Sequence, residues 1–219
     1  MSTPALAAKP FAALLKKLRG QYDPEPYPPR DAVTQLVVGF LQWEATRKQA
    51  EAALARIHAA VVDNNELRVS HNHEIIAMIG PGYPRCEERV ARLRESVQEI
   101  YVREYAVSLD GPAARGKKEV RTYIESLPGI TPYVAAHVLV TALNVPAMPV
   151  DDKLVALLAA ERCLDEGLDP HQAAQLIEKA VKADDMLATH LLLQAWSDER
   201  KGGVAAKPAR RSKSVKKKK

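Results

Sequence analysis

Hydrophobic residues recur every three or four positions along most of the chain, the spacing that places them on one face of an α-helix. Residues 33–41 and 50–61 both show this period, so two amphipathic helices are predicted that meet near Glu44 to Thr46. Apolar and polar residues nowhere alternate for long enough to indicate a β-strand. The pattern therefore predicts an all-α protein of about ten helices.

Prolines, glycines and capping residues mark where these helices start and stop. Asp31 follows the prolines of residues 24–29 and is predicted to cap the first helix, and Asp169 and Asp184 are predicted to cap later ones. Helices are also predicted over residues 4–20, 86–108, 116–127, 151–164, 170–182 and 184–199. Most arginines of the 86–108 helix alternate with glutamates and are predicted to form an exposed, charge-compensated face: Arg85, Arg89, Arg92, Arg94 and Arg103.

The composition is that of a globular protein: 219 residues, 47% hydrophobic and 27% charged. No run approaches the ~18–20 apolar residues that span a bilayer, and the N-terminus lacks the features of a signal peptide, so we expect an intracellular protein without membrane contact. Cys86 and Cys163 are too few for a disulfide framework or a four-cysteine zinc or iron–sulfur site. His71 and His73 lack the spacing of a metal site. We expect no metal and no cofactor.

The basic character of the chain comes from its last residues. Residues 207–219 hold eight basic and no acidic side chains, which leaves 24 basic and 27 acidic groups elsewhere, a formal net charge of −3. Residues 201–219 are predicted to form a disordered tail that attracts polyanions through counterion release. A solubilising tail and, less favoured, a tail for an anionic membrane surface are the alternatives.

The most specific stretch of the sequence surrounds a Pro-Gly pair. A helix must end at Leu127, because Pro128 disfavours helical geometry in the residue before it and Gly129 permits positive φ. A second helix begins almost at once, with Thr131 as its N-cap and Pro132 at its first position. This helix-hairpin-helix would direct backbone N–H groups outward, where the glycine lets a phosphate approach. An ordinary corner between two helices is the alternative.

A carboxylate downstream of the hairpin in the sequence is a second candidate functional group. Some twenty residues on, a proline-punctuated loop leads to Asp151 at the start of another helix. Asp151 is then either a helix N-cap or a catalytic group. The two roles are compatible, because an N-cap carboxylate is rigidly aimed.

The hairpin and the aspartate together resemble the helix-hairpin-helix DNA glycosylase superfamily, most closely its endonuclease III branch. That family's hairpin reads leucine-proline-glycine-valine-glycine and is followed, after a helix and a proline-bearing loop, by valine-aspartate-threonine-histidine. Weaker matches extend the resemblance over roughly residues 30–200. This chain has Leu127-Pro128-Gly129-Ile130-Thr131 and Val150-Asp151-Asp152-Lys153 at matching separation.

The resemblance implies a two-lobed fold over residues 1–200, with one lobe of about 31–145 and a second formed by 1–30 plus 146–200. Double-stranded DNA would lie in the cleft between the lobes, with the five hairpin residues gripping its phosphates and a damaged base rotated out into a pocket. We therefore expect a monomer that binds duplex DNA in the cytoplasm, associated with a bacterial nucleoid or in a eukaryotic nucleus.

The resemblance also implies roles at the pocket. Asp151 would activate water or stabilise the positive charge that develops on the sugar. Bifunctional members carry a lysine two residues after the position of Thr131, and this chain has Tyr133 there. A phenol cannot form a Schiff base, so lyase activity is not expected. Tyr133 would line the pocket or fill the groove between the lobes.

Other residues are also candidates for contact with DNA. Glu44 takes the place of the family's residue, usually glutamine, that fills the gap left by the flipped base, although a carboxylate there is repelled and desolvated. Lys117, Lys118 and Arg121 precede the hairpin and are expected to meet phosphates or to form a solvated helix start. Residues 151–199 carry a net charge of −7, which is unusual for a surface that faces DNA.

The leading hypothesis is a base-excision-repair protein that, if active, is a monofunctional DNA N-glycosylase. One alternative is a catalytically degenerate DNA-binding protein of the same fold. Another is a helical protein-interaction module with a solubilising tail.

Overall fold

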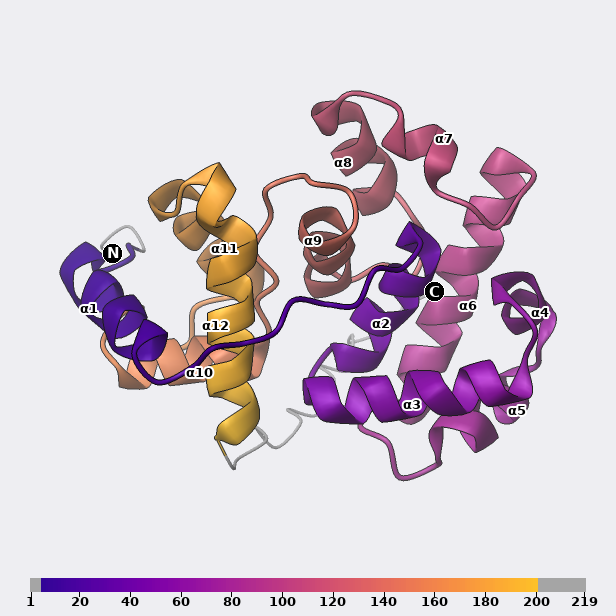
Figure 1. Cartoon of the computed structure of the whole chain (residues 1–219), viewed down its shortest axis with the longest axis horizontal. Coiled ribbons are helices and arrows are strands. Elements are labelled where there is room, and N and C mark those ends of the chain that lie inside the picture. Colours follow the sequence, from indigo (N-terminus) through magenta and orange to yellow (C-terminus); the bar gives the residue numbers. More distant parts are fainter. Residues whose placement is uncertain (1–4, 201–219) are drawn as a thin grey trace, which may run out of the picture.

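The computed structural model describes residues 5–200, so the predicted basic tail of residues 201–219 lies outside the described residues. Within the described range the chain is all-α, as predicted, with twelve α-helices, one 3₁₀ turn and no strand (Figure 1). None of these helices is both long and apolar enough to cross a membrane. The helices are α1 (Ala8–Arg19), α2 (Ala32–Gln42), α3 (Arg47–Ala60), α4 (Asn64–Val69), α5 (Asn72–Ile79), α6 (Cys86–Glu104), α7 (Asp110–Ala113), α8 (Lys117–Glu125), α9 (Pro132–Thr141), α10 (Asp152–Ala160), α11 (Pro170–Ala180) and α12 (Met186–Glu199).

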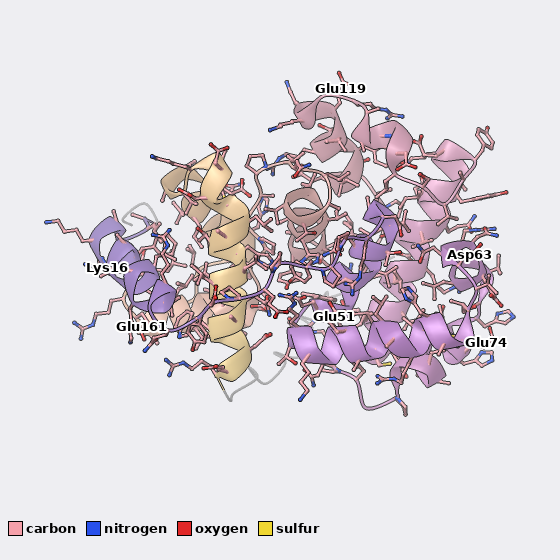
Figure 2. All side chains as sticks on the ribbon, viewed as in Figure 1. Lys16, Glu51, Asp63, Glu74, Glu119 and Glu161 are labelled. Carbon is pink, nitrogen blue, oxygen red and sulfur yellow. The ribbon has the colours of Figure 1, made fainter. Side chains whose placement is uncertain are left out.

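The helices enclose two hydrophobic cores. The larger core is formed mainly by α2, α3, α5, α6, α8 and α9 and includes Phe40 and Ile100. The smaller core joins α1 to α10, α11 and α12 and includes Leu18 and Trp196. Figure 1 shows the segment after α1 crossing from the smaller group of helices to the larger one. Charged side chains such as Lys16, Glu74 and Glu119 point away from both cores (Figure 2).

A layer of aromatic and polar side chains joins the two cores. Tyr27, from the crossing segment, lies 5.2 Å from His137 of α9 and 6.3 Å from His190 of α12, measured between ring centroids. Burial lowers the pKa of His137 well below its usual value and that of His190 to about 3. Both rings are therefore neutral, and they act as packing residues.

Capping residues set most helix starts as predicted. Asp31 accepts the N–H of Thr34 at 2.8 Å, and Asp169 accepts the N–H of His171 at 2.9 Å. The prediction for Asp184 is wrong: a 3₁₀ turn over Ala183–Asp185 precedes α12, and no side chain caps that helix. Three short helices, α4, α5 and α7, were not predicted, because six, eight and four residues are too few to show a helical period.

Arg89 contradicts the predicted exposed arginine face of α6. Its side chain is buried, with 0% exposure, and its guanidinium donates to the carbonyl oxygens of Pro84 at 3.1 Å, Trp43 at 2.6 Å and Phe40. Burial lowers its pKa to about 10, so it stays charged at neutral pH. The charge pattern along α6 cannot reveal that Arg89 finds its acceptors at the end of another helix. Arg103 does follow the prediction and pairs with Glu99 at 2.7 Å.

We expect Arg89→Met to lower the free energy of unfolding by about 2–4 kcal/mol, because three carbonyl groups lose their donor inside the protein. The matched control is Arg103→Met, which removes a partly exposed guanidinium from the same helix and should lower stability by about 1 kcal/mol or less. Urea unfolding followed by circular dichroism measures both values. Equal losses in the two variants would contradict the structural role of Arg89.

Candidate active site

The hairpin between α8 and α9 is held by α6. Gly129 has φ +74°, and a Cβ built on it would lie 2.5 Å from the backbone oxygen of Arg92. The Ser96 hydroxyl donates to the Pro128 carbonyl at 2.7 Å, and Arg92 donates to the Gly129 carbonyl at 3.3 Å. Glycine is therefore required here by a left-handed backbone and by close contact with a helix. The positive φ was predicted from the sequence, whereas the close contact with α6 was not.

The open side of the hairpin presents backbone donors. The N–H of Ile130 bonds to the Leu127 carbonyl at 3.3 Å, and the Thr131 hydroxyl caps α9 by accepting the N–H of Val134 at 3.2 Å. In the described part of the chain, no acceptor takes the N–H of Gly129 or of Thr131. Unpaired N–H groups at a helix N-terminus are suited to bind an anion such as a phosphate.

A pocket of about 300 Å³ opens beside the hairpin. Its lining brings Thr131 and Tyr133 of the hairpin and α9 together with Asp151 at the start of α10. The end of α2 contributes Glu44, and the start of α11 contributes His171. The hairpin and the downstream aspartate thus share one pocket, although they come from separate segments of the chain.

Asp151 is an N-cap whose carboxyl group lies in this pocket. Its Oδ1 accepts the N–H of Leu154 at 2.8 Å. Burial raises the pKa of Asp151 to about 6; the capping bond opposes the rise, and the charge of Glu44 adds to it. Lys153 is close by, but its ammonium donates to the carbonyl of Ser197 at 2.6 Å. Asp151 is therefore a rigidly held carboxyl that ionises near neutral pH.

Tyr133 forms the inner wall of the pocket. It is 4% exposed, its hydroxyl donates to Gln194 at 3.1 Å, and its ring stacks on His137 at 6.2 Å between centroids. Burial raises its pKa well above 10, so the phenol is neutral. The side chain both lines the pocket and fills space between the two cores, which are the two roles that the sequence left open.

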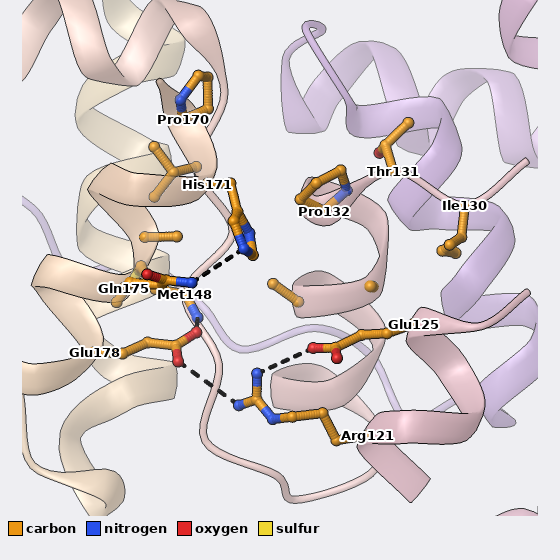
Figure 3. Close-up of a pocket in the computed structure, with 14 residues that line it drawn as sticks. Arg121, Glu125, Ile130, Thr131, Pro132, Met148, Pro170, His171, Gln175 and Glu178 are labelled. Carbon is orange, nitrogen blue, oxygen red and sulfur yellow. Dashed lines mark hydrogen bonds and ion pairs between the residues drawn. The ribbon is translucent and has the colours of Figure 1, made fainter. Parts of the chain in front are cut away.

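The basic residues of α8 separate into two kinds. Lys117 and Lys118 are exposed. Arg121 instead bonds to Glu125 at 3.3 Å, to Glu178 of α11 at 3.7 Å and to the carbonyl of Pro146. Figure 3 shows this guanidinium between the two glutamates, at the edge of a second cleft of about 500 Å³. The side chain predicted to meet a phosphate is occupied within the protein, where it ties α8 to the opposite core.

Several residues of the pocket, among them Trp43, Arg85 and His171, were missed by sequence reasoning. Trp43 and Arg85 lie beside Glu44 in the lining, and the Arg85 guanidinium is 5.0 Å from the centre of the Trp43 ring. The Gly-Pro-Gly turn ahead of α6 was visible in the sequence, but nothing indicated that it would reach the end of α2. Residues 5–200 contain no group of three or more side chains arranged to hold a metal ion. Cys86 and Cys163 are both buried free thiols.

Solved structures of an endonuclease III and of two DNA glycosylases have the same fold. Endonuclease III trapped as a covalent intermediate with DNA superposes with a TM-score of 0.68 at 14% identity, over 87% of this chain and 86% of that one. A thermostable thymine-DNA glycosylase gives 0.62 at 19% identity, over 86% of each chain. The 8-oxoguanine glycosylase/lyase of Clostridium acetobutylicum gives 0.65 at 14% identity, over 86% of this chain and 68% of that one. No protein-family model and no curated protein matches the sequence. The chain has the helix-hairpin-helix glycosylase fold.

We expect Gly129→Ala to lower the free energy of unfolding by about 2–4 kcal/mol, because the new Cβ meets the backbone of α6 and the left-handed conformation is strained. Gly82→Ala is the matched control: no atom lies within 4 Å of its added Cβ and its φ is not positive, so its stability should change by about 0.5 kcal/mol or less. Thermal and urea unfolding of both variants compare them. A Gly129→Ala protein as stable as the control would rule out the close contact.

Asp151 should make the native protein less stable as the pH rises. Its folded pKa of about 6 exceeds the ordinary value of 3.8, so its contribution is retained below about pH 4 and lost as pH rises through about 6. Asp151→Asn keeps an N-cap but removes the charge. We therefore expect this variant to be more stable than the native chain at pH 7.5 by about 1–3 kcal/mol, with little difference at pH 4.

Asp31→Asn is the control for that comparison, because Asp31 is also an N-cap aspartate but lies outside the pocket. It should change stability little at either pH. Urea unfolding of the three proteins at both pH values gives the comparison. An Asp151→Asn variant that is less stable than the native chain at pH 7.5 would contradict the raised pKa.

Proposed function

We propose that this chain, which has the helix-hairpin-helix glycosylase fold, is a DNA N-glycosylase that removes a flipped base and leaves the DNA backbone uncut. The observation that carries the proposal is the position of Asp151: a desolvated carboxyl group shares one pocket with the hairpin. Two of the proteins of the same fold named above are DNA glycosylases, and the third is an endonuclease III that forms a covalent intermediate with DNA. A merely structural N-cap needs neither a pocket nor a raised pKa.

The proposed chemistry is hydrolysis. As the bond between the base and C1′ breaks, positive charge develops on the sugar, and the ionised Asp151 stabilises it across a site that holds little water. The base leaves with the electron pair of the broken bond and takes up a proton from water. A second water molecule adds to C1′, and Asp151 accepts the proton that this water loses. The carboxyl group must be ionised for both tasks, so a pKa of about 6 keeps it active at neutral pH.

Strand cleavage by a Schiff base is not part of the proposal. Tyr133 stands in the position of the lyase lysine, and its phenol is neutral and bonded to Gln194. No lysine lines the pocket in the described part of the chain. Without an amine nucleophile the sugar has no covalent partner, and water is the acceptor.

Duplex DNA is the proposed partner. The N–H groups of Gly129 and Thr131 would receive a phosphate, and the exposed Lys117 and Lys118 on α8 would meet the strand beside it. Arg121 is left out of this set because its guanidinium is occupied by two glutamates and a carbonyl.

The test is incubation of the full chain with duplexes that carry uracil, a thymine–guanine mismatch, oxidised bases or alkylated bases. We expect abasic sites on at least one substrate, no strand break until alkali is added, and no adduct trapped by borohydride. The single-turnover rate should rise with pH to a plateau above about pH 6. Asp151→Asn should slow base release by about 100-fold or more.

Asp31→Asn, which also alters a capping aspartate but lies outside the pocket, should retain the native rate. A trapped covalent adduct would refute the hydrolytic mechanism. Tight duplex binding without base release from any substrate would instead indicate a DNA-binding protein that has lost catalysis.

A further inference from the structure

The second half of α6 exposes large apolar side chains. Tyr105 is 87% exposed, Val102 54% and Tyr101 37%. Val69, at the end of the neighbouring helix α4, is 56% exposed. One such residue on a protein surface is ordinary, but a group of them on two adjacent helices indicates a surface that binds a partner.

These side chains belong to one continuous face. Arg94, Gln98, Tyr101 and Tyr105 follow one another at intervals of four, three and four residues, which places them along one side of α6. Arg68 of α4 lies against this side: its Nη1 donates to Gln98 Oε1 at 2.9 Å, and its guanidinium is 4.0 Å from the centre of the Tyr101 ring. We call this face the α4/α6 surface; it consists of Arg68, Val69, Arg94, Tyr101, Val102 and Tyr105.

Tyr105 adopts a strained conformation at the end of α6. Its φ is +55°, in the left-handed region, and its N–H bonds to the Tyr101 carbonyl at 2.9 Å. Glycine or asparagine is usual where a helix ends in this way, because bulky side chains are disfavoured there. An aromatic ring that is both strained and exposed adds little to the core, and strain of this kind is most often found at functional positions.

The two arginines of this surface have no acidic partner. Arg68 donates to the amide oxygens of Asn65 and Gln98, and Arg94 donates to the amide oxygen of Asn72 at 2.7 Å. In the described part of the chain neither arginine forms an ion pair. The Nε of Arg94 is buried and also lacks a hydrogen-bond partner among the described residues.

Acids on the same helices are engaged elsewhere. On α6, Glu99 and Glu104 each pair with an arginine outside this surface. Glu66 of α4 and Glu74 of α5 each accept a backbone N–H at 2.6 Å. The α4/α6 surface therefore presents two positive charges beside apolar side chains, and none of its own residues is acidic.

We propose that the α4/α6 surface binds a short acidic segment of another protein. Carboxylates of the segment would pair with Arg68 and Arg94, while its apolar side chains would pack on Tyr101, Val102 and Tyr105. Tyrosine and arginine are typical anchors of protein interfaces. From Arg94 to Tyr105 the helix rises about 16 Å, so an extended segment of about five residues would cover the surface.

Nucleic acid and a second copy of the chain fit this surface less well. Duplex DNA carries a charge about every 1.7 Å, which two arginines cannot neutralise over this length, and valine side chains do not stack on bases. A second copy would bring like charges together. Figure 1 shows α4 on the opposite side of the larger core from α10 and α11, whose first residues line the Asp151 pocket. A bound segment would therefore leave that pocket open.

Selection from a library of random short peptides on the immobilised full chain provides defined probes. We expect the enriched peptides to combine aspartate or glutamate with aromatic or aliphatic residues. The Kd is then measured for a synthetic enriched peptide and for a counterpart in which lysine replaces every acid. The acidic peptide should bind with a Kd of about 100 µM or below, as a small transient interface does. Its lysine counterpart should bind at least about tenfold more weakly, because repulsion replaces the ion pairs.

Tyr105→Asn and Arg68→Gln should each weaken binding of the acidic peptide at least about fivefold. Asparagine tolerates the left-handed conformation, and an exposed side chain is replaced, so the first variant should remain folded. Arg162→Gln is the matched control, because Arg162 is also exposed but follows α10 in the other group of helices. Its Kd should equal that of the native chain. Circular dichroism melting verifies the fold of all three variants.

Failure to enrich any peptide, equal binding of the lysine counterpart, or native affinity in both Tyr105→Asn and Arg68→Gln overturns the inference. Displacement of the acidic peptide by labelled DNA would assign the surface to nucleic acid and overturn it as well. A dimer in sedimentation velocity that Tyr105→Asn dissociates would do the same in favour of a second copy. The inference does not depend on the glycosylase proposal, which base release tests separately.

Discussion

The packing of α6 against the hairpin and against the end of α2 is the constraint on which the pocket depends. On one side, the backbone of α6 approaches Gly129 so closely that a Cβ would lie 2.5 Å from a main-chain oxygen. On the other side, Arg89 extends from the same helix and binds carbonyl groups at the end of α2 and in the turn before α6. Both contacts involve main-chain atoms, which cannot adjust as a side chain can. The single helix α6 therefore positions two walls of the pocket, although few of its own residues line the pocket.

Exposure to water determines the charge states of the ionisable groups at the site. Tyr133, His137 and His190 are buried, and burial keeps all three neutral. Asp151 lies at the boundary between this neutral layer and the pocket, which raises its pKa without preventing ionisation at neutral pH. A carboxylate held in that position makes the folded state less stable, and under the proposed function the same desolvation would make its charge act more strongly on a substrate.

Much of the fold could be predicted from the sequence, because helices, caps and the Pro-Gly hairpin depend on local chemistry. Asp31 and Thr131 cap their helices as expected, since an N-cap needs only its own next turn. The failures involve partners that are distant in the sequence. Arg89 and Arg121 looked like solvated or phosphate-binding cations, but each finds acceptors on other helices. Arg85 was counted as part of an exposed face for the same reason, and its contact with Glu44 joins residues 41 positions apart. Charge patterns along one helix cannot reveal acceptors that tertiary packing supplies.

Arg121 also explains how the loop that leads to Asp151 is held across the boundary between the two cores. Its guanidinium reaches Glu178 of the smaller core and the carbonyl of Pro146, while Glu178 accepts the N–H of Met148 at 2.9 Å. These bonds fix residues 146–150, the segment that carries Asp151 toward the hairpin. A cation that bound phosphate would have to leave this network, so Arg121 serves to position the loop instead. The acids of residues 151–199 also have structural roles: Glu178 fixes the loop, and Asp151 and Asp169 cap helices.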